Sequence, residues 1–149
     1  MEDLKYGQVR GGNVGVPVPL AASQAFKAKS GRFVYLDGSG HAVLCADGAN
    51  EIFGFAEESE RTSSATAAAE SAKVIIDPTA IFRIPVLNGT FAITMVGKTC
   101  DLIDVGGVQG ADLGAADDDV LIVVDGDVVG NKWVDVRVNP KEIAQSGVV

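Results

Sequence analysis

The sequence of 149 residues is poor in the residue types that most catalytic and metal sites require. It has one histidine, His41, and two cysteines, Cys45 and Cys100, whose separation fits no usual zinc or redox motif. Any Ser-His-Asp or Cys-His site would need His41, and nothing adjacent in the sequence supplies a nucleophile and an orienting acid. We therefore expect no enzyme activity and no cofactor, and two reduced, structural thiols.

Basic residues and long apolar runs are also scarce. The formal net charge is −8, and a nucleic-acid partner is not expected because neutralising phosphates needs a basic face. The longest apolar runs fall well short of the roughly 18–20 residues of a membrane span, and the first residues lack the apolar segment of a secretory signal. The sequence thus predicts a protein that is made in a cytoplasm and has no membrane partner.

The acidic residues are concentrated in one segment. Residues 99–131 contain eight aspartates and no lysine or arginine, whereas residues 1–36 are mildly basic. Solvated turns explain this distribution, and complementary charge between neighbouring copies in an oligomer is the alternative. A calcium site is also left open, because hard cations take clustered carboxylates on loops, although no complete calcium-binding loop with its closing glutamate is present. The aspartates concerned are Asp112, Asp117, Asp118, Asp119, Asp125 and Asp127.

Glycine, in contrast, is abundant: eighteen glycines and an aromatic content of only 6% favour many turns over long helices. A glycine-rich turn at 37–40 separates the apolar strands 32–36 and 41–45 and predicts a hairpin. A second turn leads into the strand 51–56, where Gly54 indicates a bulge or the close approach of another backbone. This part of the chain predicts a compact β-meander.

The remainder of the chain continues the pattern of short strands. The pair Asn88-Gly89 between apolar runs is a strong hairpin signal, and residues 106–119 are expected to form a long loop. In the strand 132–138, Trp133 falls on the outer face, where it anchors an interface or lies flat over a barrel rim. The Ala/Ser/Thr-rich residues 57–72 predict an exposed loop or short helix. The whole indicates an all-β fold, a small β-barrel or β-tulip-like domain of about eight or nine short strands.

The beginning of the chain has a different character. Residues 1–15 are polar and interrupted by glycine, which predicts an extended N-terminal arm ahead of a single β-rich domain, residues 16–149. The alternating valines and prolines of residues 16–20 suit an edge strand or a polyproline segment. Such a segment either docks on a partner or covers the open edge of a barrel. Candidate contacts with a partner or another copy are Tyr6, Val9, Arg10, Val14, Val16, Pro17, Val18, Pro19 and Trp133.

The order of these features resembles the small capsid decoration, or cement, proteins of tailed bacteriophages. The resemblance spans most of the chain and consists of strand and turn patterns without a fixed chemical group. It rests on the glycine-interrupted arm and on residues 28–34, 40–44, 52–56, 91–93 and 96–97.

The resemblance implies a structural virion protein. Members of this family are small β-barrels or β-tulips that bind the outside of a phage head, usually as trimers at three-fold positions, often with an arm that reaches a neighbour. On this basis the expected partners are the major capsid protein and further copies of the chain in a homotrimer, and the expected location is the outer capsid surface of the virion. The alternatives are a ligand-binding or enzymatic β-barrel and a tail or head-fibre module.

Overall fold

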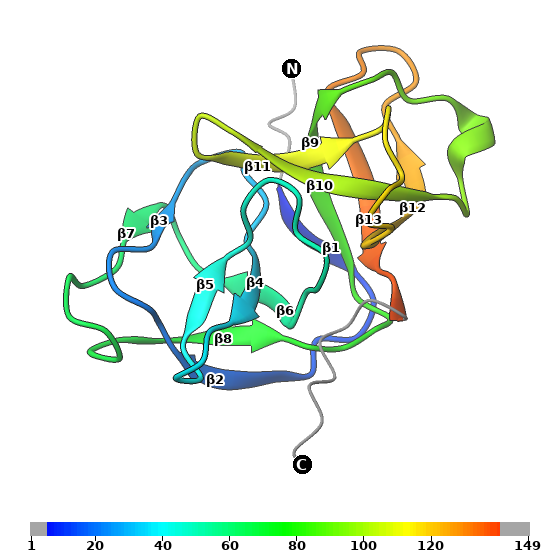
Figure 1. Ribbon diagram of the computed structural model, residues 1–149. Coiled ribbons are helices and arrows are strands. Elements are labelled where there is room, and N and C mark those ends of the chain that lie inside the picture. The colour runs from blue at the N-terminus through cyan, green and yellow to red at the C-terminus, as the bar shows by residue number, and fades with distance from the viewer. Residues whose placement is uncertain (1–5, 141–149) are drawn as a thin grey trace.

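Two β-sheets and a two-stranded ribbon make up the computed structural model, which describes residues 6–140 (Figure 1). The all-β fold expected from the sequence is confirmed. Thirteen strands are present in this part of the chain, more than the eight or nine expected: residues 25–26 and 61–62 are too short to carry a readable pattern, and residues 7–10 and 108–112 lie in segments expected to be an arm and a loop. The elements are β1 (Gly7–Arg10), β2 (Gly15–Pro19), β3 (Ala25–Phe26), β4 (Phe33–Leu36), β5 (Ala42–Leu44), β6 (Gly54–Glu57), β7 (Arg61–Thr62), β8 (Ser71–Ile75), β9 (Ile81–Asn88), the 3-10 helix η1 (Ile93–Met95), β10 (Thr99–Val105), β11 (Val108–Asp112), β12 (Leu121–Gly126) and β13 (Trp133–Val138).

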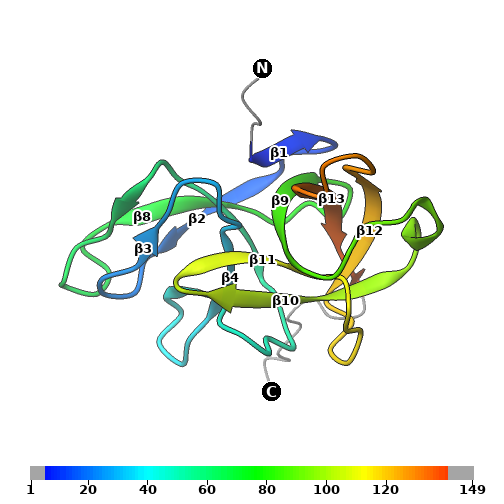
Figure 2. The same ribbon diagram turned by 90° about the horizontal axis from the view of Figure 1, so that it is seen from above.

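The first sheet is organised around β9, whose two edges are both paired. β13 runs antiparallel along one edge, and β1 and β11 pair with the two halves of the other. Because β11, β10, β12 and β13 also pair in that order, the pairing of β13 with β9 produces a ring of five strands. Figure 2 shows β9, β12 and β13 curving around this ring. The barrel-like character expected from the sequence therefore belongs to the second half of the chain.

The second sheet has the order β2-β8-β6-β4-β5 and contains the predicted hairpin. β4 and β5 pair antiparallel, and the carboxylate of Asp37 accepts hydrogen bonds from the N–H groups of Ser39 and His41, both at 2.9 Å. The predicted meander, in which each strand pairs with the next along the chain, is wrong, because β6 pairs with β4 and not with β5. After β5 the chain crosses back over the sheet, and the Phe53 N–H donates to the carbonyl of Val34 at 2.8 Å. β4 consequently lies between β5 and β6.

Successive side chains of the second sheet enter two different cores. Phe33 and Phe55 face the five-stranded ring and belong to its core, whereas Val34, Ala56 and Val74 point the other way into a smaller core beneath β2. This is the period-two alternation of a strand with both faces buried. The second sheet is thus a partition between two apolar cores.

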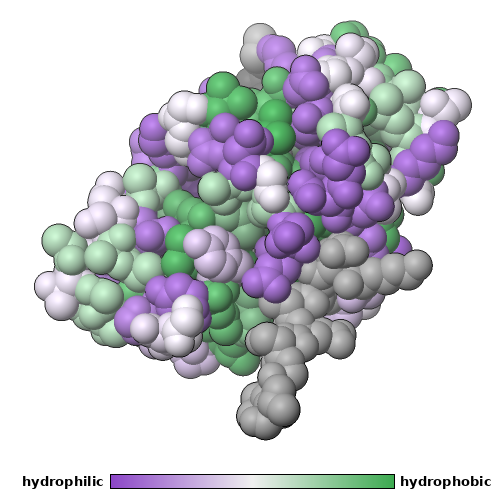
Figure 3. Space-filling model, in the orientation of Figure 1, coloured by the Kyte–Doolittle hydropathy of each residue, from purple (hydrophilic) through white to green (hydrophobic). Residues whose placement is uncertain are grey.

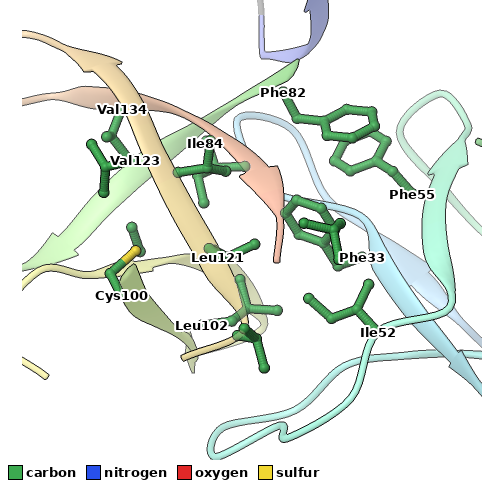
Figure 4. Close-up of a cluster of buried hydrophobic side chains, with 14 of the residues drawn as sticks. Phe33, Ile52, Phe55, Phe82, Ile84, Cys100, Leu102, Leu121, Val123 and Val134 are labelled. Carbon is green, nitrogen blue, oxygen red and sulfur yellow. The ribbon is translucent and has the colours of Figure 1, made fainter. Parts of the chain in front are cut away.

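Three phenylalanines join the two sheets. Phe33 of β4 and Phe55 of β6 meet Phe82 of β9, with ring centroids 4.2 Å apart for the stacked pair of Phe55 and Phe82. Phe33 contacts both of the other rings edge to face, at 5.0 Å and 5.5 Å. Figure 4 shows the three rings together beside the aliphatic core of the ring. Aromatic pairs of this geometry add about 0.5–1.5 kcal/mol each beyond the area that they bury.

One buried polar side chain also ties the sheets together. Gln109 of β11 is 3% exposed, and its Oε1 accepts a hydrogen bond from the Phe33 N–H at 2.8 Å. Its Nε2 donates to the carbonyls of Phe33 and Cys45 at 3.0 Å and 3.1 Å. The side chain of Gln109 therefore supplies a partner for the Phe33 N–H and for the Cys45 carbonyl, while the Phe33 carbonyl also accepts from the Cys45 N–H at 2.9 Å. The prediction of a long loop over residues 106–119 is wrong here, because Val108–Asp112 forms β11.

Two further local expectations can be compared with the structure, and only the first of them is revised. Gly89 has the positive φ of a turn residue, +82°, but no returning strand follows the Asn-Gly pair; η1 follows instead. The side chain of Asn131 holds this turn, since it accepts from the Phe91 N–H at 2.7 Å and donates to the Gly89 carbonyl at 2.9 Å. Residues 63–70 form turns without a helix. Figure 3 shows this side of the molecule, at the lower left, in the pale colours of alanine, serine and threonine.

Both cysteines are buried and free, as predicted. Burial raises the pKa of the Cys45 thiol and of the Cys100 thiol to about 12. Both thiols are therefore protonated at neutral pH and act as small apolar side chains in the core.

Gly54 illustrates a close approach that the sequence did predict. A Cβ atom at this position would lie 2.5 Å from the carbonyl oxygen of Ile75 on β8. We expect Gly54→Ala to lower the free energy of unfolding by about 1–3 kcal/mol, because β6 and β8 would have to separate. Gly38→Ala is the matched control, since no atom lies within 4 Å of its added Cβ. Equal stability of the two variants in urea titrations would contradict the close approach.

Candidate functional site

The N-terminal segment lies against the body along both sheets. β1 pairs with β9, Gly7 opposite Arg83 and Gln8 opposite Phe82, and β2 pairs with β8 along its whole length. Residues 7–10 of the expected arm are therefore a strand on a sheet edge that would otherwise present unpaired backbone groups, and the domain boundary at residue 15 stays a prediction. Residues 1–5, the beginning of the expected arm, lie outside the described residues.

The valine and proline strand, β2, is the edge strand that its sequence predicts. Pro17 faces solvent and Pro19 is half-buried, so neither ring interrupts the ladder with β8. Val18 is only 5% exposed and packs in the smaller core, and Val16 packs against the same core. Val18 is therefore wrong as a candidate contact, because alternation along the strand turns its side chain inward.

The link between β1 and β2 carries the most exposed of the apolar candidates. Val14 is 63% exposed, while its carbonyl accepts a hydrogen bond from the Ile76 N–H at 2.9 Å. Arg10 is exposed as well, and Val9 is half-buried. The backbone of this link is thus anchored at Val14, and its side chain is presented to solvent.

Trp133 stands on the outer face of β13, as predicted. Val134, Val136 and Val138 point inward and are buried, whereas the guanidinium of Arg83 lies over the Trp133 ring, 3.6 Å from its centroid. This geometry is a cation–π contact. Arg83 thus covers one face of the ring, and the choice between an interface anchor and a ring lying over the barrel rim stays a prediction.

Arg83 is held in place by a bidentate ion pair. Its Nε donates to Oδ1 of Asp135 at 2.8 Å and its Nη2 to Oδ2 at 3.1 Å. Asp135 is only 1% exposed, and this hydrogen bonding raises the pKa of Arg83. Paired charges of this geometry are among the stronger ion pairs in proteins. We call Arg83, Trp133 and Asp135 the Arg83 cluster.

Tyr6 lies close enough to the Arg83 cluster for the charge of Arg83 to affect its pKa. Burial raises the pKa of Tyr6, an effect that Arg83 opposes and Asp127 reinforces. The fold thus brings Tyr6 and Trp133, two candidates from opposite ends of the sequence, to the same cationic group. Arg83 and Asp135 were not predicted as site residues. Their opposite charges stand at outward positions of two strands that are both rich in β-branched residues, and such charges can pair across neighbouring strands.

An exposed apolar turn was also missed. Val128 and Val129, between β12 and β13, are 63% and 99% exposed. The turn is rigid, because the carboxylate of Asp127 accepts from the N–H groups of Gly130 and Lys132 at 2.9 Å and 3.1 Å. We call Val128 and Val129 the valine tip. Exposed apolar groups on a fixed turn are typical of contact surfaces.

Aspartates of the acidic segment accept hydrogen bonds from backbone N–H groups. The buried carboxylate of Asp101 accepts hydrogen bonds from the N–H groups of Asp117, Asp118 and Asp119 at 2.9–3.1 Å. Asp112 likewise caps the Gly114 N–H at 2.9 Å. Among residues 6–140 no three His, Cys, Asp or Glu side chains converge as a metal ion would require. Local turn chemistry accounts for the positions of these acids.

No helix within residues 6–140 is long and apolar enough to cross a membrane. Comparison with known proteins finds no matching family model, no similar curated protein and no similar solved structure.

Proposed function

We propose that this protein is a structural virion component that binds the outer surface of a phage head and stabilises the capsid lattice by bridging major capsid protein subunits. The observation that carries the proposal is the ordered series of strand and turn patterns that resembles the decoration proteins. The all-β fold, with a ring of strands, agrees with what that resemblance implies. The protein acts as a homotrimer in this proposal and has no catalytic role.

The mechanism is mechanical. A shell under internal DNA pressure opens where its subunits separate, and a protein bound across such a boundary must be detached before the boundary can open. Each contact can be modest, since a trimer that engages several sites gains avidity by intramolecular binding. A body whose two sheets are joined by buried aromatic and polar contacts suits this role, because it transmits force without deforming.

Three surfaces are available for such contacts. The link at Val14 and the neighbouring proline strand are pre-extended, so little conformational entropy is lost when they dock. The Arg83 cluster offers a tryptophan and an arginine, the residue types that most often dominate binding energy. The valine tip adds an apolar contact at the end of the ring. We assign the capsid contact to the first of these surfaces and the contacts between copies to the other two.

Substitution of Val14 tests the assignment. We expect Val14→Asp to weaken binding to heads about tenfold, equivalent to ~1.4 kcal/mol, because a carboxylate would lose its hydration in the contact. The free energy of unfolding should change by less than about 0.5 kcal/mol, since the side chain is 63% exposed. Pelleting with heads in an ultracentrifuge measures the first quantity and urea titration the second.

Val105→Asp is the matched control, because Val105 is 56% exposed at the turn between β10 and β11. It should bind heads as the unsubstituted protein does. If Val105→Asp loses binding and Val14→Asp keeps it, the capsid contact lies on the ring and the assignment to the link is wrong.

The trimer is tested by molar mass in solution. Light scattering on the eluate of a sizing column should give three times the mass of one chain. A monomer at all protein concentrations would remove the avidity on which the mechanism depends.

A further inference from the structure

A cavity of about 370 Å³ lies where β1 meets the strands β6 and β8 of the second sheet. Phe55 and Ile75, which belong to the ring core and are 3% and 2% exposed, supply apolar lining together with Ala56. Polar groups from Tyr6 and Asn13 stand on the β1 side. The volume falls in the range of small-molecule sites, roughly 300–1,000 Å³.

The guanidinium of Arg32 is the most unusual group in this cavity. Arg32 is only 8% exposed; its Nη1 and Nη2 donate to the carbonyls of Ser30 and Lys27 at 3.2 Å and 3.0 Å. Its Nε is buried and has no hydrogen-bond acceptor. Within residues 6–140 no carboxylate lies in ion-pair contact with it. Buried charges without a counterion are rare because desolvation is costly.

The acids on the cavity wall form no direct ion pair with Arg32, because each is paired with another cation. Glu58 is bound by Arg61, whose Nε and Nη2 donate to its two oxygens, both at 2.8 Å. Glu57 is 61% exposed, and its carboxylate lies 3.9 Å from the ammonium of Lys73. Burial lowers the pKa of Arg32 and the more distant Glu58 and Glu60 oppose this effect. The cavity therefore contains a cation that lacks a partner in contact and a wall on which an apolar group can lie.

We infer that this cavity binds a small organic monocarboxylate with an apolar body, its carboxylate against Arg32 and its body against Phe55 and Ile75. Arginine matches a carboxylate in shape and charge, and one unpaired guanidinium suits a singly charged group. The acids Glu57 and Glu58 on the wall disfavour phosphate and other ligands of higher negative charge. This site adjoins the link at Val14 through Asn13 and lies near the Arg83 cluster through Tyr6, but the inference does not depend on the proposed capsid function.

The test is a titration with isocaproate, followed by the ¹⁵N–¹H resonances of the arginine Nε–H groups and the backbone amides of Phe55 and Ile75. We expect saturable shifts at Arg32, Phe55 and Ile75. Isohexanol has the same apolar body without the carboxylate and should bind at least about tenfold more weakly. Equal binding of the alcohol, or no saturable shift with isocaproate up to roughly 10 mM, would overturn the inference.

Two variants and a control identify the groups. Arg32→Gln should weaken isocaproate binding at least about tenfold, whereas Arg137→Gln, a change on the outer face of β13, should leave it unchanged. Because loss of Arg32 also removes two hydrogen bonds to the backbone, Glu57→Gln provides a test that does not rely on a loss. Removing this exposed negative charge should tighten binding about two- to threefold. Unchanged affinity in a folded Arg32→Gln variant would overturn the inference.

Discussion

Gln109→Leu is expected to lower the free energy of unfolding by about 3–5 kcal/mol. Leucine has nearly the same size but leaves the N–H of Phe33 and the carbonyl of Cys45 without partners in the core, while the Phe33 carbonyl keeps its hydrogen bond from the Cys45 N–H. Each unsatisfied buried group costs about 1–3 kcal/mol, and partial relaxation keeps the total below the simple sum. Since small domains have only about 5–15 kcal/mol of stability, this one change should remove a large fraction of it.

Urea titration followed by the fluorescence of Trp133, the sole tryptophan, measures this loss. Gln8→Leu is the matched control: the Gln8 side chain also donates to three backbone carbonyls, but at a partly exposed position where water can replace it. The control should lose less than about 1 kcal/mol. If both variants lose the same small amount, Gln109 does not join the sheets in the way described.

Asp135→Asn is expected to destabilise the protein by about 2–4 kcal/mol. Asparagine keeps the shape of the side chain but removes the charge that pairs with Arg83, at a site that is 1% exposed. Breaking a fully buried pair costs about 3–5 kcal/mol, and the lower figure applies because the Arg83 side chain is 23% exposed and keeps some contact with water. The guanidinium should also leave the Trp133 ring, which changes the tryptophan emission of the folded protein.

The exposed ion pair between Lys73 and Glu57 supplies the comparison. Its side chains are 46% and 61% exposed, and Glu57→Gln should change stability by less than about 0.5 kcal/mol. A native emission spectrum that is unchanged in Asp135→Asn would show that Trp133 does not depend on Arg83. In that case the Arg83 cluster would not be a coupled unit.

The parts of the fold that the sequence predicted are those determined by neighbouring residues. The hairpin of β4 and β5 follows from the turn at 37–40, and the edge position of β2 follows from its prolines, which cannot donate to a second neighbour. Gly54 was readable as a close approach because a strand interior rarely contains glycine without such a reason. In each case the cause and its effect lie within a few residues.

The parts that failed depend on contacts between distant segments. The partner of β6 is β4 instead of β5, because burying both Phe33 and Phe55 against Phe82 requires the two strands side by side. β11 contains glycine and glutamine and no apolar run, so its place in the ring could not be recognised before Gln109 was seen to complete the backbone pairing of β4. Strand propensity is weak where tertiary pairing decides.

The predictions for the candidate site residues divide in the same way. Trp133 was correctly placed outward by alternation, but its partner Arg83 lies on another strand. Val18 was wrong for the complementary reason: in a short edge strand the pattern does not show which alternate face is covered. Arg32 was predicted only as a strand residue, because nothing in the local sequence indicates that its guanidinium is buried without a carboxylate in contact.

Co-sedimentation with tailed-phage heads that lack their own decoration protein tests the central claim most directly. The account predicts saturable binding at a stoichiometry set by three-fold positions of the shell, and a higher temperature for release of the packaged DNA. Val14→Asp should weaken that binding about tenfold while the folded protein remains intact. Failure to bind any head in a panel of such shells, at concentrations where the protein is folded, would contradict the proposal that it is a capsid decoration protein.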